Sequence, residues 1–169
     1  MHKIITIWIG GGTDRSGRRR KPMPYAGTDT PFLRSVAEIK AMLQKFKCET
    51  IIDYQKQGTD PKYGDLAFNT IGFEKDGLKY LIEFPITFVE NSKGKHLNMD
   101  ISGRIVYNRI KALLVDAEIE YLTFHEAMLP YLALQTPHGP MSVMEVVQSQ
   151  LSEIKKGTSG LFLLPGGNR

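Results

Sequence analysis

A cluster of cationic side chains near the start of the chain has the residue types best suited to binding a charged ligand. It comprises Arg15, Arg18, Arg19, Arg20 and Lys21. A cation placed near a phosphate releases condensed counterions, so a basic segment can bind nucleic acid without reading its sequence. Trp8 and Tyr25 flank the cluster and could stack on bases. The cluster therefore predicts phosphate contact, and the alternative is a solvated basic loop that only keeps the protein soluble.

Two further groups of cations are candidates for the same role. Lys93 and Lys95 lie in a polar segment, residues 91–98, that precedes a long helical pattern. Arg104 and Arg109 flank Tyr107 within that pattern. Guanidinium groups bind phosphates or carboxylates in a bidentate manner. Structurally, Tyr107 could instead pack on a sheet while Arg109 reaches the acidic residues at 116–120, and the sequence leaves both interpretations open.

Three carboxylates raise the possibility of a metal-dependent nuclease. Asp53, Asp65 and Glu83 lie on neighbouring predicted strands and could converge on a metal ion. No spacing between them requires this, because the three positions are far apart in the sequence and belong to no known ligand pattern. Side chains on the solvent side of a sheet are therefore the favoured interpretation, and a nuclease is the third hypothesis.

The histidines and glycines match no complete metal or nucleotide motif. His125 precedes Glu126, but no second histidine follows at the four-residue spacing of a zincin helix. His96 and His138 lie in separate loops without cysteine partners. The three glycines at 10–12 lack the Gly-Lys-Ser/Thr ending of a phosphate loop. We therefore predict no metal, no cofactor and no catalytic residue, which favours a non-enzymatic role.

The elements that must position these groups can be predicted from periodicity and turn residues. A helix begins at Thr30-Pro31 and ends near Lys47, and alternating apolar residues predict strands that follow it, at 50–54, 66–73 and 78–84. Asp76-Gly77 is typical of a tight hairpin turn between the last two strands. A last helix is predicted over 142–155. The order indicates an α+β fold, in which a small antiparallel β-meander packs with an N-terminal helix and two or three C-terminal helices.

The central helix has the strongest pattern in the chain. Its apolar positions recur at three- and four-residue spacing and form one face, namely Ile101, Ile105, Val106, Ile110, Leu113, Leu114 and Ala117. Asp100 or Ser102 could cap its first turn. Thr123 and Glu126 form a capping-box pattern, so a second helix should begin near Phe124. Pro130 predicts that this short helix bends or stops there.

This central stretch resembles a group of small proteins encoded by phages and mobile elements. The resemblance is carried by Arg104, Tyr107 and Arg109 on the helix and then by Leu129-Pro-Tyr131. Tyr107 stands where the group has tryptophan, and Ala112-Leu113 replaces an acidic–aromatic pair. The resemblance covers roughly residues 30–150 and implies an origin in a phage or mobile element, without implying a particular activity.

Composition and length predict a soluble cytoplasmic protein. The chain has 169 residues, 41% of them hydrophobic and 24% charged, as expected for a globular domain. Cys48 is the single cysteine, which excludes an intramolecular disulfide framework. No apolar run approaches the roughly 20 residues that a membrane span needs. We divide the chain into an N-terminal strand with a basic arm (1–29), an α+β domain (30–156) and a tail (157–169).

Charge is distributed unevenly along the chain. Residues 1–50 hold ten Lys/Arg and four Asp/Glu, whereas residues 112–154 hold six acidic residues and neither Lys nor Arg. Such asymmetry is typical of a polyanion-binding arm or of head-to-tail assembly between copies. The leading hypothesis is a nucleic-acid-binding accessory protein of a phage or mobile element. The alternative is a protein–protein interaction module, such as an inhibitor of a host factor, that acts through the acidic helical surface.

Overall fold

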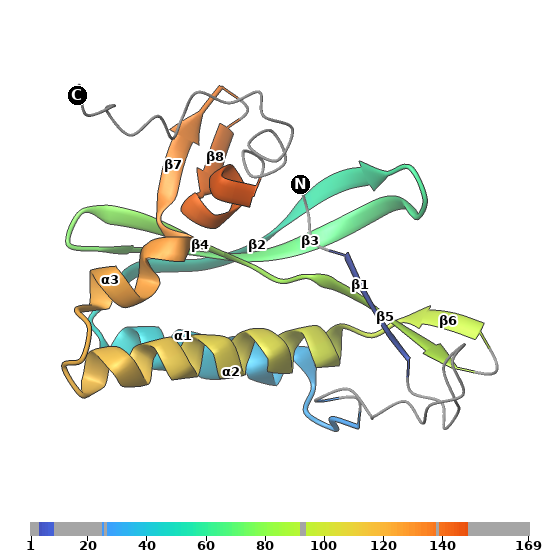
Figure 1. Cartoon of the computed structure of the whole chain (residues 1–169), viewed down its shortest axis with the longest axis horizontal. Coiled ribbons are helices and arrows are strands. Elements are labelled where there is room, and N and C mark those ends of the chain that lie inside the picture. The colour runs from blue at the N-terminus through green and yellow to red at the C-terminus, as the bar shows by residue number, and fades with distance from the viewer. Residues whose placement is uncertain (1–3, 9–24, 26, 92–93, 138, 149–169) are drawn as a thin grey trace, which may run out of the picture.

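A three-stranded antiparallel meander forms the centre of the molecule in a computed structural model, which describes residues 4–8, 25, 27–91, 94–137 and 139–148. Its strands are β2 (Glu49–Asp60), β3 (Gly64–Lys75) and β4 (Leu78–Glu83), in the order β2-β3-β4. Helices α1 (Phe32–Lys45) and α2 (Met99–Glu118) lie side by side across one face. The hairpin of β7 (Ala133–Thr136) and β8 (Gly139–Ser142) lies on the other face (Figure 1). This arrangement confirms the predicted α+β fold.

The main core lies between the meander and the two helices. Ile71 of β3 pairs with Ile82 of β4, and both are fully buried. Phe73 pairs with Tyr80, and their rings stack with centroids 5.0 Å apart. Because side chains alternate across a strand, these pairs lie on one face of the sheet, where they meet the apolar faces of the helices. Helix α2 contributes the predicted residues Val106, Ile110 and Leu114 to this core.

A second sheet lies beside the meander and was not predicted. Strand β1 (Ile4–Trp8) pairs in parallel with β5 (Ile86–Asn91), and β6 (Gly94–Leu97) pairs antiparallel with β5. The prediction of a loop over 91–98 was therefore wrong, because part of that segment forms β6. The third predicted strand, at 78–84, corresponds to β4, and the chain continues after Pro85 directly into β5. Ile7 and Val89 of this sheet pack against Ile101, so α2 covers both sheets.

The strands and turns of the meander also differ from prediction at one end. Strand β2 continues to Asp60, beyond the predicted end of this strand at residue 54, because Gly58 pairs with Leu66 inside the ladder. The turn lies at residues 61–63. At the other end, Asp76 and Gly77 have φ angles of 52° and 77°, which confirms the predicted tight turn.

The cap of α2 is Asn98, whose side chain accepts a hydrogen bond from the Ile101 amide, so the prediction of Asp100 or Ser102 was wrong. Asp100 caps α1 instead, since its Oδ1 accepts the Phe32 amide hydrogen at 2.7 Å. Pro31, the residue before α1, has no side-chain oxygen to do so. Ser102 is buried and donates to the Pro85 carbonyl at 2.6 Å. Both predicted caps thus connect α2 to other parts of the fold.

The segment after α2 follows the predicted order with one addition. Helix α3 (Phe124–Met128) begins with the predicted capping box of Thr123 and Glu126, and a 3-10 turn follows at Leu129–Tyr131. Strands β7 and β8 form a hairpin that was not predicted. Residues 143–148 are helical and form the first part of the predicted last helix. Residues 149–169 lie outside the described part of the chain, as does most of the predicted basic arm.

Within the described residues, no helix combines the length and apolar character needed to cross a membrane.

Gly103 sets the distance between α1 and α2, and this can be tested. A Cβ at position 103 would lie 3.0 Å from Ser35 Cβ and 3.1 Å from Phe32 Cδ2. Helix propensity alone predicts that Gly103→Ala stabilises the protein by about 1 kcal/mol. We expect instead a loss of about 1–3 kcal/mol, because the helices must separate. Chemical denaturation measures the change.

The exposed position Ala112 on the same helix provides the matched control. Ala112→Gly should cost about 1 kcal/mol through propensity alone. A Gly103→Ala variant that is more stable than the parent would contradict close packing at this crossing.

Candidate functional site

The predicted cationic site residues do not form one site in the described structure. Arg15, Arg18, Arg19, Arg20 and Lys21 lie outside the described residues, as does Lys93. Lys95 lies on β6, and Arg104 and Arg109 lie on α2. These last three residues have different surroundings.

Arg104 binds a carboxylate of the neighbouring helix. Its Nη1 lies 2.8 Å from Glu38 Oε2, and its guanidinium lies 4.1 Å from the centroid of the Tyr107 ring. Burial alone would raise the pKa of Glu38, but its hydrogen bonds with Arg104 and Arg34 lower that pKa below the usual value. Tyr107 packs against the main core. Arg104 is therefore engaged in holding α1 against α2, which matches the structural interpretation of this motif more closely than phosphate binding does.

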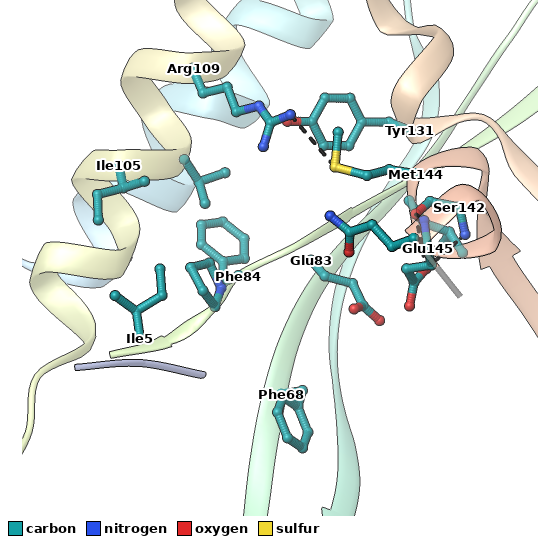
Figure 2. Close-up of a pocket in the computed structure, with 14 residues that line it drawn as sticks. Ile5, Phe68, Glu83, Phe84, Ile105, Arg109, Tyr131, Ser142, Met144 and Glu145 are labelled. Atoms are coloured by element: carbon teal, nitrogen blue, oxygen red, sulfur yellow. Dashed lines mark hydrogen bonds between the residues drawn. The ribbon is translucent and has the colours of Figure 1, made fainter. Parts of the chain in front are cut away.

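Arg109 extends from a different side of α2 than Arg104 and lines a small cavity (Figure 2). Its guanidinium lies 5.5 Å from the centroid of the Tyr131 ring and donates a hydrogen bond to Met144 Sδ at 3.6 Å. It does not reach the acidic stretch at 116–120. The cavity has a volume of about 110 Å³. Pockets for small molecules usually exceed about 300 Å³, so this one has room only for a few water molecules.

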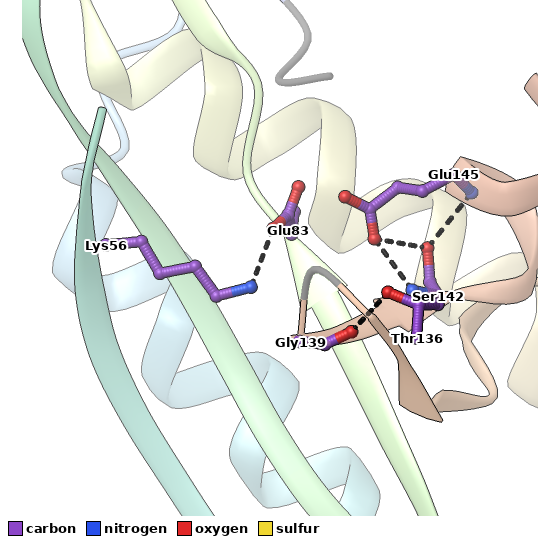
Figure 3. Close-up of polar contacts among 6 residues, drawn as sticks. All are labelled: Lys56, Glu83, Thr136, Gly139, Ser142 and Glu145. Carbon is purple, nitrogen blue, oxygen red and sulfur yellow. Dashed lines mark hydrogen bonds and ion pairs between the residues drawn. The ribbon is translucent and has the colours of Figure 1, made fainter. Parts of the chain in front are cut away.

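The carboxylates near this cavity are occupied by neighbouring groups (Figure 3). Glu83 pairs with Lys56 of β2 at 3.3 Å. Glu145 accepts hydrogen bonds from the Ser142 amide at 2.7 Å and from its hydroxyl at 2.9 Å. This second arrangement is a capping box at the start of the helix over 143–148. Both contacts have structural roles.

The three carboxylates considered for a nuclease do not converge. Asp53 pairs with Lys40 of α1, while Asp65 Oδ1 accepts the Thr59 hydroxyl hydrogen at 2.7 Å. Along β3, the position opposite Asp53 is six residues from Asp65, or about 20 Å. Glu83 lies on the other face of the sheet from Asp53. Among the described residues, no group of three His, Cys, Asp or Glu side chains could hold a metal ion.

His125 is part of a hydrogen-bonded chain that sequence analysis did not identify. Its Nε2 lies 3.0 Å from Asp76 Oδ2, and its Nδ1 lies 2.6 Å from the Tyr80 hydroxyl. If Nε2 donates to the carboxylate, Nδ1 must accept from Tyr80. Burial raises the pKa of Tyr80, so the hydroxyl keeps its proton. Burial likewise raises the pKa of neighbouring Cys48 to about 11.

Burial limits access to part of this chain of hydrogen bonds. Tyr80 is 1% exposed and Cys48 is 8% exposed, so neither can reach a substrate. The contacts connect α3 with the turn between β3 and β4. A reactive thiol requires a lowered pKa, whereas the pKa of Cys48 is raised.

A more accessible group, which we call the aromatic–lysine cluster, comprises Lys62, Tyr63, Phe88 and Lys95. The Tyr63 and Phe88 rings stack with centroids 4.8 Å apart and 21° between their planes. Lys95 Nζ lies 4.4 Å from the Tyr63 centroid and 4.8 Å from the Phe88 centroid, and donates to the Tyr63 hydroxyl at 2.7 Å. Lys62 Nζ lies 5.2 Å from the Tyr63 centroid. Both lysines are exposed and both rings are partly exposed.

The turn between β2 and β3 places Tyr63 in this cluster. Asp60 Oδ1 accepts the amide hydrogens of Lys62 at 2.8 Å and Tyr63 at 3.0 Å, which closes the turn after Pro61. Gly64 follows with a φ of +73°, a conformation that favours glycine. The hydrogen bond from Lys95 is the largest effect that lowers the pKa of Tyr63, with smaller contributions from Lys62 and Thr6.

The predicted basic arm joins the body near this cluster. Strand β1 ends at Trp8, whose backbone lies opposite Glu90 of β5, and Glu90 lies opposite Lys95 of β6. Arg15 follows Trp8 by seven residues, a length of chain that spans at most about 25 Å. Lys95 is thus the one predicted cation of the described residues that lies at this end.

Sequence analysis found Lys95 but missed Tyr63 and Phe88. The Asp60-Pro61 start of the turn and Gly64 at its end were available signals for an exposed tip. The contact between the rings was not predictable from the sequence. Tyr63 lies at a turn of one sheet and Phe88 on a strand of another, and no short-range sequence pattern indicates that these sheets lie side by side.

No protein-family model, no curated protein and no solved structure matches this chain.

The interaction of Asp76 with its neighbours predicts a dependence of stability on pH. Hydrogen bonding to Lys75, and then to His125, lowers the pKa of the Asp76 carboxyl. A carboxyl with a lowered pKa in the folded state stabilises the protein above its unfolded pKa of about 3.9 and loses this effect as the pH falls through the folded value. As the pH is lowered from 6 to 3, the melting temperature should therefore decrease less for Asp76→Asn than for the parent. Thermal unfolding at a series of pH values measures this.

Glu118→Gln, which alters an exposed carboxyl outside this network, is the matched control. Equal pH profiles for the parent and Asp76→Asn would contradict a native-state role for this carboxylate.

Proposed function

We propose that the protein binds nucleic acid without sequence readout, as a non-enzymatic accessory protein of a phage or mobile element. The observation that supports this most strongly is the aromatic–lysine cluster, in which exposed cations and partly exposed rings lie together at the end from which the arm leaves. Cationic side chains and stacking surfaces are the two components of sequence-independent binding to nucleic acid. The resemblance of the central helix supports the proposed origin.

The arm supplies most of the positive charge in this scheme. Asp60 and Asp65 flank the turn that carries Lys62, and Glu90 is the register partner of Lys95, so without the arm this group carries three acidic and two basic side chains. Four arginines and one lysine at 15–21 change this balance. Arg104 and Arg109 lie on other faces and are assigned no phosphate contact.

Removal of arm charge should weaken binding and also reduce its dependence on salt. Each phosphate contact contributes about 0.9 to the slope of log K against log salt for duplex DNA and about 0.7 for single strands. We expect R18A/R19A/R20A to lower affinity and, with single-stranded probes, to reduce the magnitude of this slope by about two. Lys95→Ala should reduce it by somewhat less than one. Fluorescence anisotropy at several salt concentrations measures both quantities.

Lys45→Ala is the matched control, because it removes one exposed cation from the C-terminal end of α1. That end lies on the other side of the molecule from β5 and β6 (Figure 1). Undiminished affinity in R18A/R19A/R20A would remove the arm from this account. A loss in Lys45→Ala as large as that in Lys95→Ala would contradict a localised interface.

Binding of a protein partner is a second candidate function, favoured by exposed apolar side chains at the end of α2. Val115, Ile119 and Tyr121 are 41%, 66% and 76% exposed. Carboxylates lie between them in the sequence, namely Asp116, Glu118 and Glu120. An apolar patch with acidic surroundings fits a basic protein that inserts an apolar anchor.

The two candidates can be separated with the double variant I119D/Y121D. Under the second candidate, a basic protein retained by the parent in a pull-down at low salt should be lost with this variant, while affinity for nucleic acid is unchanged. Retention of the same proteins by parent and variant would contradict a partner site at this end.

A further inference from the structure

The aromatic–lysine cluster presents an aromatic ring at an exposed turn, with another ring behind it. Tyr63 projects from a turn, and one face of its ring lies against Phe88. An aromatic ring has two faces, so the stack can continue on the side of Tyr63 that Phe88 does not cover. A planar group of similar size, such as a nucleobase, would extend the stack by one member.

The surface beside the stack is also suited to bases. Thr6 of β1 and Leu97 of β6 are the register partners of Phe88 on either side, so all three lie on one face of the second sheet. Leu97 is 52% exposed, and Thr6 is exposed as well. This row crosses three strands, and Tyr63 stacks on Phe88 at its centre. It offers an apolar surface next to a stacking surface, with Lys95 within 5 Å of both rings.

The two lysines are placed to hold the phosphates of a strand whose base stacks on Tyr63. Lys62 neighbours Tyr63 in the turn, and Lys95 approaches from β6, so cations reach the ring from two elements. Neither lysine has a carboxylate partner among the ion pairs found in the described residues. Both side chains are exposed and can rotate toward a phosphate.

We infer that this cluster binds an unpaired nucleobase, with Tyr63 as the stacking residue, and that the protein therefore prefers single-stranded to duplex nucleic acid. This inference rests on the proposed function and extends it to a class of ligand. In a duplex the faces of the bases are covered by their neighbours, so only a single strand or a loop can supply a base to the ring. The arm contacts phosphates in either form.

Competition between strand forms tests the inference with the full chain. The probes are fluorescently labelled 20-nucleotide oligo(dT), oligo(rU) and a 20-base-pair duplex, titrated at one salt concentration. The parent should bind the two single strands more tightly than the duplex. Tyr63→Ala should weaken single-strand binding by roughly ten-fold, as expected for the loss of one stacked base, and should leave duplex binding within about two-fold.

Further variants separate stacking from a loss of structure. Tyr63→Phe keeps the ring and should keep single-strand affinity. Tyr63→Leu keeps an apolar anchor on Phe88 but has no aromatic face, so it should behave like Tyr63→Ala while the melting temperature remains close to that of the parent. Leu78→Ala removes an exposed apolar side chain from the start of β4, outside the cluster, and should have no effect.

The outcomes distinguish the inference from the function beneath it. Equal affinity of the parent for single strands and duplex, unchanged in Tyr63→Ala, would overturn the inference and leave nucleic-acid binding intact. Failure of the parent to bind any of the three probes would overturn the proposed function as well. Binding of only one of oligo(dT) and oligo(rU) more tightly than the duplex would support the stacking site and show that the protein also responds to the sugar or to the C5 methyl group, in which these two probes differ.

Discussion

Burial of the inner face of the meander by α1 and α2 is the constraint on which the rest of the structure depends. Ile71 and Ile82 from the sheet are fully buried, as are Ile39, Leu43 and Ile110 from the helices. Burial of each such side chain contributes about 1.5–3 kcal/mol. Because α2 continues past the meander to cover Val89 of the second sheet, this same contact fixes the position of β5 and β6. The aromatic–lysine cluster therefore depends on the helix layer, although neither helix contributes a residue to it.

Helix α2 also separates the aromatic–lysine cluster from the acidic segment at 116–120. It has 20 residues, which corresponds to a length of about 30 Å. Its first turn follows β6 and Lys95, and its last turn leads into the acidic segment at 116–120. Electrostatic screening lengths are about 8 Å at physiological salt. The carboxylates at 116–120 therefore have little effect on a polyanion bound at the other end of α2.

The parts of the fold that sequence analysis predicted are those with local causes. The face of α2 follows from the spacing of Val106, Ile110 and Leu114, and the Thr123–Glu126 capping box follows from a four-residue pattern. The second sheet has no local cause, because the pairing of β1 with β5 joins segments about 80 residues apart. Phe88 was missed for this reason, and Tyr63 because its turn lies beyond the predicted end of β2. The caps at Asp100 and Ser102 were misassigned because tertiary partners, Phe32 and Pro85, take their side chains.

The salt dependence of single-strand binding by the unmodified protein tests the central claim most directly. Anisotropy titrations with oligo(dT) between about 50 and 200 mM salt give the slope of log K against log salt. Contacts from the arm and from the two lysines of the cluster predict tight binding at low salt and a slope of about −3 or steeper, since each phosphate contact on a single strand contributes about −0.7. No binding at 50 mM salt would contradict the account. It would direct attention to the acidic, apolar end of α2 and to a protein partner.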